Sequence, residues 1–352
     1  MKNNKYTIGI LGLGEGRSTI SAALSSEKLE LGMICDLNED MCKKRAEEFN
    51  FPNYTTSYET MLANPEIDII GIYTPDKLHA GHIRMALEAG KHVVSTKPLM
   101  DNLDQASELL LLQEKSGKKV FVGQSSRFFE PMMRQRMDFE KGILGNIITI
   151  ETHYNADHRW FLEKPWAREE SFKWLFGGLS HPVDLLRWYM PDIEEVMGYG
   201  LISENGRKGG LKNEDTMHFI LKTASGSIAQ ISGSYSGPVQ PHTRSSQMSC
   251  IIRGTEACSQ ADYPDLRYAL TSADKQEQLI TFDHRSNHYF RFEGHSHHAG
   301  EYQNYLDYFV DCLSSGQTAY PDLKEGIGTV AVMQAMEKSL KSGKPEKVKY
   351  LW

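Results

Sequence analysis

The sequence predicts an α/β protein with two domains: a doubly wound parallel sheet in residues 1–124, followed in residues 125–352 by an α+β domain with a large, mostly antiparallel, open-faced sheet. Three observations predict this. Strand-like and helix-like segments alternate in the first part, strand-like segments succeed one another in the second, and 352 residues can form two separate cores. The last helix could pack back on the first domain.

Each strand-like run of the first part is followed by a helix-like run. This order makes βαβ units and therefore a parallel sheet with helices on both faces. We expect strands at 6–12, 30–36, 67–73, 91–95 and 119–123. We expect helices at 17–26, 39–49, 57–63, 77–89 and 103–116.

In the second part, strand-like segments follow one another without long helices between them. We expect strands at 146–157, 193–203, 214–223, 226–235, 247–253 and 278–283. One helix, at 182–189, interrupts them, and helices at 298–314 and 323–341 close the chain. Such spacing is typical of a largely antiparallel sheet with one helix-covered face and one open face. An open face generally needs a cover, so we expect a homodimer or homotetramer.

Composition and charge argue against several kinds of partner. The formal net charge is −7 and no lysine–arginine block appears, which argues against nucleic acid. No apolar stretch approaches the ~20 residues that span a bilayer, so no membrane partner is expected. The five cysteines lack C-x-x-C spacing and suggest a reducing compartment, so we expect a cytoplasmic protein.

Residues 6–18, YTIGILGLGEGRS, predict a strand that turns sharply into a helix whose amino end can hold a diphosphate. Gly12 permits the tight turn, and Gly14 lets the backbone approach the phosphates. The third glycine of G-x-G-x-x-G should fall at Arg17, whereas Gly16 comes one residue early. The candidate contacts to a dinucleotide are Gly12, Gly14, Glu15, Gly16 and Arg17.

Asp36 ends the second predicted strand, roughly twenty residues after the glycines. A carboxylate there can accept hydrogen bonds from the adenosine ribose and would repel a 2′-phosphate, which favours NAD over NADP. Asp36 could also cap the 39–49 helix, and the two roles do not exclude each other. Arg17 could pair with a phosphate, so NADP stays the alternative.

Two polar turns follow later strands, Thr74-Pro75 and Thr96-Lys97-Pro98. Both turns are expected at the carboxyl ends of parallel strands, where open α/β sheets bind ligands. Thr74 can donate to a phosphate or ribose. Lys97 is a cation within reach of nicotinamide and substrate, although a solvated loop lysine is the commoner case.

The segments TPDKLHAGHIRMALEAGKHVV, STKPL, VGQSSRF and GGLSHPVDLLRW make the chain resemble the Gfo/Idh/MocA family of oxidoreductases over essentially its whole length. The resemblance implies a Rossmann domain followed by an α/β domain, NAD or NADP as cofactor, and sugars, polyols or related ring alcohols as substrates. It also implies cofactor contacts at Thr74, Pro75, His79, Thr96 and Lys97, an active-site histidine at His181, and a substrate contact at Arg127.

Two positions depart from the family pattern. The glutamate that precedes the family's lysine is Thr96 here, so Lys97 lacks an adjacent carboxylate. The aspartate four residues before the active-site histidine is Gly177, for which Asp184 or Asp157 could substitute.

Oxidation of a carbinol requires a base for the hydroxyl proton and a positive group for the forming alkoxide. His181 suits the base because imidazole titrates near pH 6.5. Lysine begins near 10.4, so Lys97 is expected to act electrostatically, or to share a proton with His181. Without the family resemblance, a histidine that caps the following helix would be the better explanation of His181.

The predicted strand ETHYNADHRW places His153, Asn155 and Asp157 on one face and Tyr154 and His158 on the other. The first three could bind sugar hydroxyls on the open face of the sheet. Polar residues on a solvated face would alternate in the same way.

Two aromatic or histidine-rich features have alternative explanations. Tryptophans at 160, 166 and 174 could stack on a pyranose ring, or belong to a core or subunit interface. Histidines at 284, 288, 295, 297 and 298 could bind a metal, but their spacing matches no zinc pair, so no metal is predicted.

The sequence therefore predicts an NAD-dependent oxidoreductase that acts on a sugar, a sugar derivative or a cyclic polyol. Thr96 and Gly177 leave two alternatives open. One is a redox-neutral NAD-dependent lyase or hydrolase that cleaves glycosides, and the other is a nucleotide-binding regulator without turnover.

Overall fold

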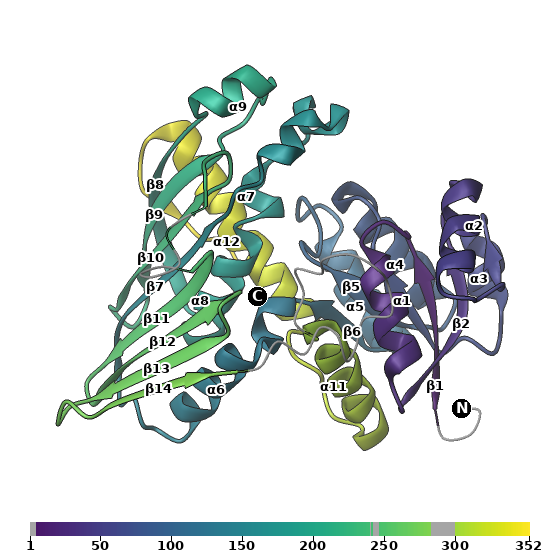
Figure 1. Ribbon diagram of the computed structural model, residues 1–352, viewed down its shortest axis with the longest axis horizontal. Coiled ribbons are helices and arrows are strands. Elements are labelled where there is room, and N and C mark those ends of the chain that lie inside the picture. The colour runs from purple at the N-terminus through teal and green to yellow at the C-terminus, as the bar shows by residue number, and fades with distance from the viewer. Residues whose placement is uncertain (1–4, 240, 242–245, 283–299) are drawn as a thin grey trace. The chain divides into compact units, whose positions relative to one another are not determined.

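The computed structural model describes residues 5–239, 241, 246–282 and 300–352. The chain forms two compact units, one of residues 1–128 with 284–328 and one of residues 129–283 with 329–352 (Figure 1). The first unit thus includes a late segment that the sequence analysis assigned to the second domain. The two units are described separately below.

The first unit contains a six-stranded, wholly parallel sheet in the order β3-β2-β1-β4-β5-β6. This confirms the doubly wound prediction, and the order reverses between β1 and β4, where such sheets bind ligands. The strands are β1 Tyr6–Leu11, β2 Leu29–Cys35, β3 Tyr54–Thr55, β4 Ile69–Ile72, β5 His92–Thr96 and β6 Val120–Gly123.

Capping residues mark some of the helix ends of this unit. Asn38 accepts from Met41 N at 3.2 Å and starts α2, while Gly117, at φ +66°, ends α5. The helices are α1 Gly16–Ser25, α2 Glu39–Glu48, α3 Tyr58–Ala63, α4 His79–Glu88 and α5 Ala106–Ser116, with 3₁₀ turns η1 Asp76–Leu78 and η2 Ser125–Phe128.

The late segment contributes α11, Glu301–Ser315, which packs against α1 and β6 (Figure 1). The Tyr305 hydroxyl lies 2.6 Å from that of Tyr73, and the Phe309 ring stacks on Phe121 with centroids 5.4 Å apart. These buried aromatic contacts complete the core of the first unit.

The second unit contains a nine-stranded sheet in the order β14-β13-β12-β11-β7-β10-β9-β8-β15. All neighbouring strands are antiparallel except β7 and β10, which confirms a largely antiparallel sheet. The strands are β7 Ile147–Asn155, β8 Ile193–Leu201, β9 Thr216–Thr223, β10 Ile228–Ser234, β11 Met248–Gly254, β12 Ala257–Tyr263, β13 Arg267–Ser272, β14 Glu277–Thr281 and β15 Glu346–Lys347.

Helices cover one face of this sheet (Figure 1). Thr152 Oγ1 donates to Pro182 O of α8 at 3.1 Å, and Gln135 Nε2 of α6 donates to Cys250 O at 3.0 Å. The unit contains α6 Glu130–Glu140, α7 Trp174–Gly177, α8 Ser180–Tyr189, α9 Glu204–Gly209, most of α12 Leu323–Ser342, and 3₁₀ turns η3 Arg159–Glu163 and η4 Pro165–Arg168. The prediction of a single helix between the strands was wrong, because α7 and α9 also lie between them, and α6, which precedes β7, was not predicted.

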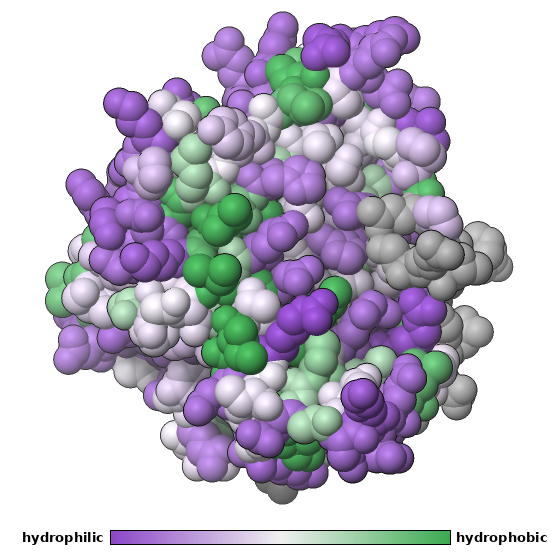
Figure 2. All heavy atoms as spheres, turned by 90° about the vertical axis from the view of Figure 1, so that its left-hand side faces the viewer, coloured by the Kyte–Doolittle hydropathy of each residue, from purple (hydrophilic) through white to green (hydrophobic). Residues whose placement is uncertain are grey.

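Among the described residues, no helix lies on the other face of the sheet, which is the face seen in Figure 2. In β9, Met217, Phe219 and Leu221 are buried, while Ile220 is 63% exposed between them. Hydrophobic patches lie between hydrophilic ones on this face (Figure 2). Its exposed apolar residues include Tyr199, Leu201, Ile228 and Leu279.

Across the parts of the chain that the structure describes, every helix is too short or too polar to span a bilayer.

Candidate functional site

The loop between β1 and α1 requires glycine at two positions. Gly12 has φ +87°, and a Cβ there would lie 2.5 Å from Tyr73 O. A Cβ at Gly16 would lie 3.0 Å from Ile10 Cγ2, so Gly16 allows α1 to pack closely on β1. Gly16 therefore serves the packing role that the sequence pattern expected at position 17.

The amino end of α1 is open. Gly14 and Glu15 are exposed, and a Cβ at Gly14 would meet nothing within 4 Å. Glu15, the N-cap residue, makes no side-chain cap hydrogen bond. The first N–H groups of a helix and its dipole attract anions, so this loop suits a diphosphate.

Asp36 is hydrogen-bonded to this loop. Its Oδ2 accepts from Leu13 N at 2.9 Å, and its Oδ1 accepts from Asn38 N at 3.0 Å. The N-cap of α2 is Asn38 rather than Asp36, so the capping interpretation of Asp36 was wrong. The carboxylate is instead held at the carboxyl end of β2, next to the glycine loop.

Arg17 makes an ion pair with Glu48 of α2, with Arg17 Nε 2.6 Å from Oε1. Glu48 Oε2 also accepts from Arg45 Nη1 at 2.6 Å. Arg45 Nε in turn donates to Leu13 O at 3.0 Å. A phosphate was the partner expected for Arg17, whereas the structure shows the carboxylate of Glu48.

His79 links the two polar turns. Its Nε2 is hydrogen-bonded to Thr74 O at 2.6 Å and its Nδ1 to Pro98 O at 2.8 Å, and the side chain is fully buried. His79 therefore holds the ends of β4 and β5 together, and its backbone-bridging role differs from a direct cofactor contact.

The Thr74 side chain also contacts α4, the helix that contains His79. Its Oγ1 lies 3.0 Å from His82 Nδ1, and burial lowers the pKa of His82, with a smaller contribution from His79. Pro75 is exposed at the start of η1. The turn is thus fixed on its helix side and open on its other side.

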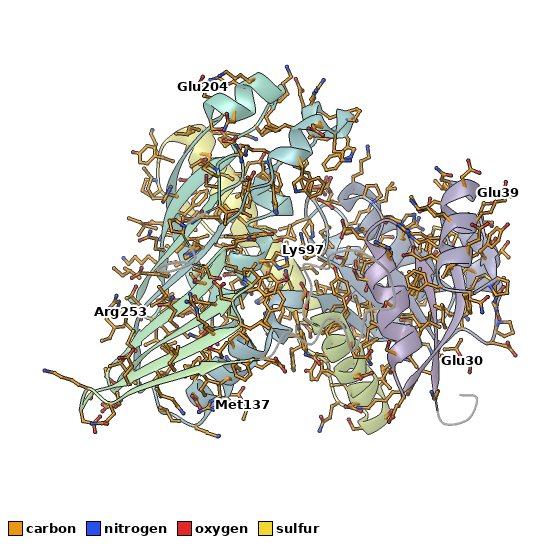
Figure 3. All side chains as sticks on the ribbon, viewed as in Figure 1. Glu30, Glu39, Lys97, Met137, Glu204 and Arg253 are labelled. Atoms are coloured by element: carbon orange, nitrogen blue, oxygen red, sulfur yellow. The ribbon has the colours of Figure 1, made fainter. Side chains whose placement is uncertain are left out.

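Lys97 directly follows Thr96, the last residue of β5 (Figure 3). Burial lowers the pKa of Lys97, and the carboxylates of Asp76 and Glu15 oppose this effect. Burial likewise raises the pKa of Asp76, opposed by His79 and Lys97. Asp76 therefore supplies a carboxylate to Lys97 from the neighbouring turn, where the sequence analysis found none.

In the second unit, His181 is the second residue of α8 and is 8% exposed. The edge of its ring meets Tyr154, with centroids 6.0 Å apart and planes at 75°. Asp184, on the same helix, is fully buried. The structure thus brings Tyr154 to His181, a neighbour that the sequence analysis placed outside the site.

The alternation of side chains along β7 explains why Tyr154 lies next to His181. Thr152 and Tyr154 lie on the face covered by α8, whereas His153 and Asn155 alternate onto the open face. His153 Nε2 makes a hydrogen bond of 3.0 Å with Ser246 O. Asp157 accepts from Arg159 Nε at 2.7 Å, which holds the pKa of Asp157 below its usual range.

The tryptophans divide into two kinds. Trp174 is buried and stacks on Tyr235 with centroids 4.4 Å apart, which confirms a core position. Trp160 and Trp166 are 53% and 43% exposed and remain available as surface contacts.

Arg127 belongs to the first unit and is 2% exposed. Its Nη1 donates to Glu325 Oε2 at 2.9 Å. Within the described ranges, no group of three or more His, Cys, Asp or Glu side chains could hold a metal ion. The histidines at 284–298 lie outside the described residues.

Within the first unit, the structure gathers the glycine loop, Asp36, Thr74, Thr96 and Lys97 at the carboxyl ends of β1, β2, β4 and β5. Sequence reasoning missed Asp76, Glu48 and Tyr154. The one available signal for Asp76 was its place directly after Thr74-Pro75 at a strand end.

Residues 6–124 match a family model described as "Oxidoreductase family, NAD-binding Rossmann fold". Residues 138–349 match a second model, "Oxidoreductase family, C-terminal alpha/beta domain". Together the two models account for nearly the whole chain.

Two curated relatives and one solved structure are among the proteins that resemble the chain. 1-Carboxy-3-chloro-3,4-dihydroxycyclohexa-1,5-diene dehydrogenase from Comamonas testosteroni is 28% identical over 51% of this chain and 46% of its own length. The oxidoreductase YrbE from Bacillus subtilis strain 168 is 23% identical over 97% of this chain and 96% of its own. A levoglucosan dehydrogenase in complex with NADH shares the fold, with a TM-score of 0.84, 18% identity, and 99% and 100% of the two chains covered.

Proposed function

The chain belongs to the Gfo/Idh/MocA family of NAD(P)-dependent oxidoreductases, and we propose that it transfers a hydride between NAD and a hydroxyl-bearing carbon of a sugar, a sugar derivative or a cyclic polyol. The observation that carries this proposal is the carboxylate of Asp36 anchored on the open glycine loop, beside the strand ends that bear Thr74 and Lys97. The name of the levoglucosan dehydrogenase of the same fold supports the substrate class.

The residues of the first unit fit a dinucleotide. Gly12 and Gly14 keep side chains away from the loop, the open end of α1 attracts the diphosphate, and Asp36 accepts hydrogen bonds from the adenosine ribose. A 2′-phosphate would meet the Asp36 carboxylate at close range, so NAD is the preferred cofactor. When bound, the nicotinamide accepts or supplies the hydride.

We assign roles in the proton chemistry to two side chains, His181 and Lys97. His181 takes the hydroxyl proton as the general base. Lys97 stabilises the negative charge that develops on the substrate oxygen, and Asp76 favours the charged form of Lys97 that this role needs. Thr96 has no carboxylate to contribute.

The proposal is tested by incubating the purified protein with NAD and a panel of sugars and cyclic polyols while NADH absorbance is followed. Sustained NADH formation supports the dehydrogenase. Cleavage of a glycoside without net NADH supports the redox-neutral alternative that Thr96 and Gly177 leave open, and NAD binding without either supports a regulator.

The catalytic assignments are tested with Lys97→Ala and His181→Ala, which should abolish turnover and spare NAD binding. The exposed Lys77 and His218 provide matched controls, since Lys77→Ala and His218→Ala remove the same groups elsewhere. Near-normal turnover in either site variant would show its assignment to be wrong.

The open sheet face supports a homodimer or homotetramer, because exposed apolar side chains on it gain from a cover. The cytoplasm is the proposed location, since all five cysteines lie in the described part of the chain and are unpaired.

A further inference from the structure

Glu48 sits between two guanidinium groups. Its Oε1 accepts from Arg17 Nε at 2.6 Å and its Oε2 accepts from Arg45 Nη1 at 2.6 Å. The carboxylate is 17% exposed, so the two pairs are partly shielded from water. One carboxylate thus engages the positive charge of both arginines.

These pairs involve residues of α1 and α2 and lie beside the glycine loop that would hold the cofactor. Arg45 Nε donates to Leu13 O at 3.0 Å, and Leu13 N donates to Asp36 Oδ2 at 2.9 Å. Arg17 is the second residue of α1. Both guanidinium groups therefore lie next to the glycine loop on which the carboxylate of Asp36 is anchored.

Recognition of a 2′-phosphate depends on a nearby cation. The group carries about two negative charges, and arginine is its best partner because a guanidinium can donate two parallel hydrogen bonds. Dinucleotide-binding folds that accept NADP place an arginine near the ribose for this purpose. An arginine already paired with a carboxylate must break that pair before it can serve a phosphate.

We propose that Glu48 is a specificity-determining residue: by pairing with Arg17 and Arg45, it withholds their charge from a 2′-phosphate and favours NAD over NADP. This inference rests on the proposed NAD-binding function and adds a second determinant to Asp36. Asp36 repels the phosphate directly, whereas Glu48 removes the cations that could compensate for that repulsion.

The test compares dissociation constants for NADH and NADPH, measured by nucleotide fluorescence at low salt. Glu48→Gln should tighten NADPH binding relative to NADH by roughly five-fold, the scale of one partly exposed ion pair. The gain should shrink at high salt because exposed charges are screened. Glu47→Gln is the matched control, since Glu47 is an exposed neighbour on the same helix, and it should leave the ratio unchanged.

Two further variants distinguish a role of Glu48 in cofactor selectivity from a structural role in supporting the glycine loop. Glu48→Asp keeps the charge and should keep the wild-type ratio. The double variant E48Q/R17Q should lose most of the gain, because the gain requires the released guanidinium. Loss of affinity for both nucleotides in equal measure in Glu48→Gln would show a purely structural role and overturn the inference.

Arg17→Gln tests the inference without disturbing Glu48. Because Glu48 already neutralises Arg17, this variant should change the affinities for NADH and NADPH in the same proportion. A selective loss of NADPH affinity would show that Arg17 serves the phosphate despite Glu48, and would overturn the inference while leaving the proposed function intact. Failure of the unchanged protein to bind NADH would overturn both.

Discussion

The carboxylate of Asp76 supports the charge of Lys97, whose pKa is lowered by burial. Asp76 begins the turn after β4, and Lys97 lies in the turn after β5. The family's adjacent glutamate is Thr96 in this chain, so the negative charge near the lysine comes from a different strand end. The charge on Lys97 is therefore adjustable through Asp76.

Asp76→Asn should shift the pH dependence of turnover. Removing a nearby negative charge disfavours the ammonium, so the pKa of Lys97 falls further and its charge is lost at lower pH. The alkaline limb of the kcat/KM profile should move to lower pH. The exposed Asp104 is a control, since Asp104→Asn should leave that limb in place. An unmoved limb in Asp76→Asn would mean that Lys97 does not act as a cation.

Gly12→Ala and Gly14→Ala should separate folding from binding. A Cβ at Gly12 would strain a positive φ and lie 2.5 Å from Tyr73 O, so we expect a loss of about 2–4 kcal/mol in unfolding free energy. Gly14 has open space around it, so Gly14→Ala should change stability by less than about 0.5 kcal/mol. Its methyl group should still weaken NADH binding. Urea unfolding and fluorescence titration distinguish the two outcomes.

His79→Ala should loosen both strand-end turns. It removes two hydrogen bonds and leaves the buried carbonyls of Thr74 and Pro98 without these partners, at a cost of about 2–4 kcal/mol. NADH affinity should fall as well, because the turns that line the site are less ordered. Arg84→Ala, on the same helix, should do neither. Wild-type stability in His79→Ala would contradict the bridging role.

His92 should make the protein less stable in acid. Burial lowers its pKa to about 4, and its Nδ1 accepts from Lys119 N at 3.1 Å. A histidine in the unfolded chain titrates near 6.5. The stabilisation that comes from neutral His92 is therefore complete above that pH and is lost as pH falls toward 4. After allowance for partial solvent screening, we expect a loss of about 1–2 kcal/mol.

His92→Asn keeps a hydrogen-bond acceptor without the titration, so its unfolding free energy should fall less between pH 7 and about 4.5. The exposed His218 is the control, because His218→Asn should follow the wild-type curve. If the unfolding free energies of His92→Asn and wild type fall in parallel with pH, His92 is not the cause of the loss of stability in acid.

Ile220→Glu should weaken self-association. Ile220 is 63% exposed on the open sheet face, so a charge there costs little in an isolated chain but is unfavourable in a covered interface. Sedimentation should show a smaller species with an unchanged melting profile of the subunit. Leu111→Glu, on α5, places the same charge on another exposed position and should leave the assembly intact.

The features that could be predicted from the sequence are those formed by residues close to one another along the chain. The glycine loop, Asp36 and the polar turns at Thr74 and Lys97 all depend on local order: strand, turn, helix. Their positions at strand ends follow from the parallel sheet, which alternation predicts. For the same reason the five main strands of the first unit were anticipated within two residues at each end.

The features that were missed depend on contacts between distant segments. Period-two alternation separates Tyr154 from His153 but does not say which face α8 covers. Strand β12, Ala257–Tyr263, alternates small and polar residues and therefore shows no apolar face. The pairing of Arg17 with Glu48 joins residues thirty-one positions apart, which no local pattern reports.

The placement of α11 has a consequence for synthesis of the chain. Residues 301–328 complete the first unit, so its hydrophobic interior stays unfinished until the ribosome has made almost everything else. During that interval Phe121 lacks Phe309, and Tyr73 lacks Tyr305. A nascent or truncated polypeptide that stops near residue 128 would expose this aromatic surface and would be prone to aggregate or to recruit chaperones.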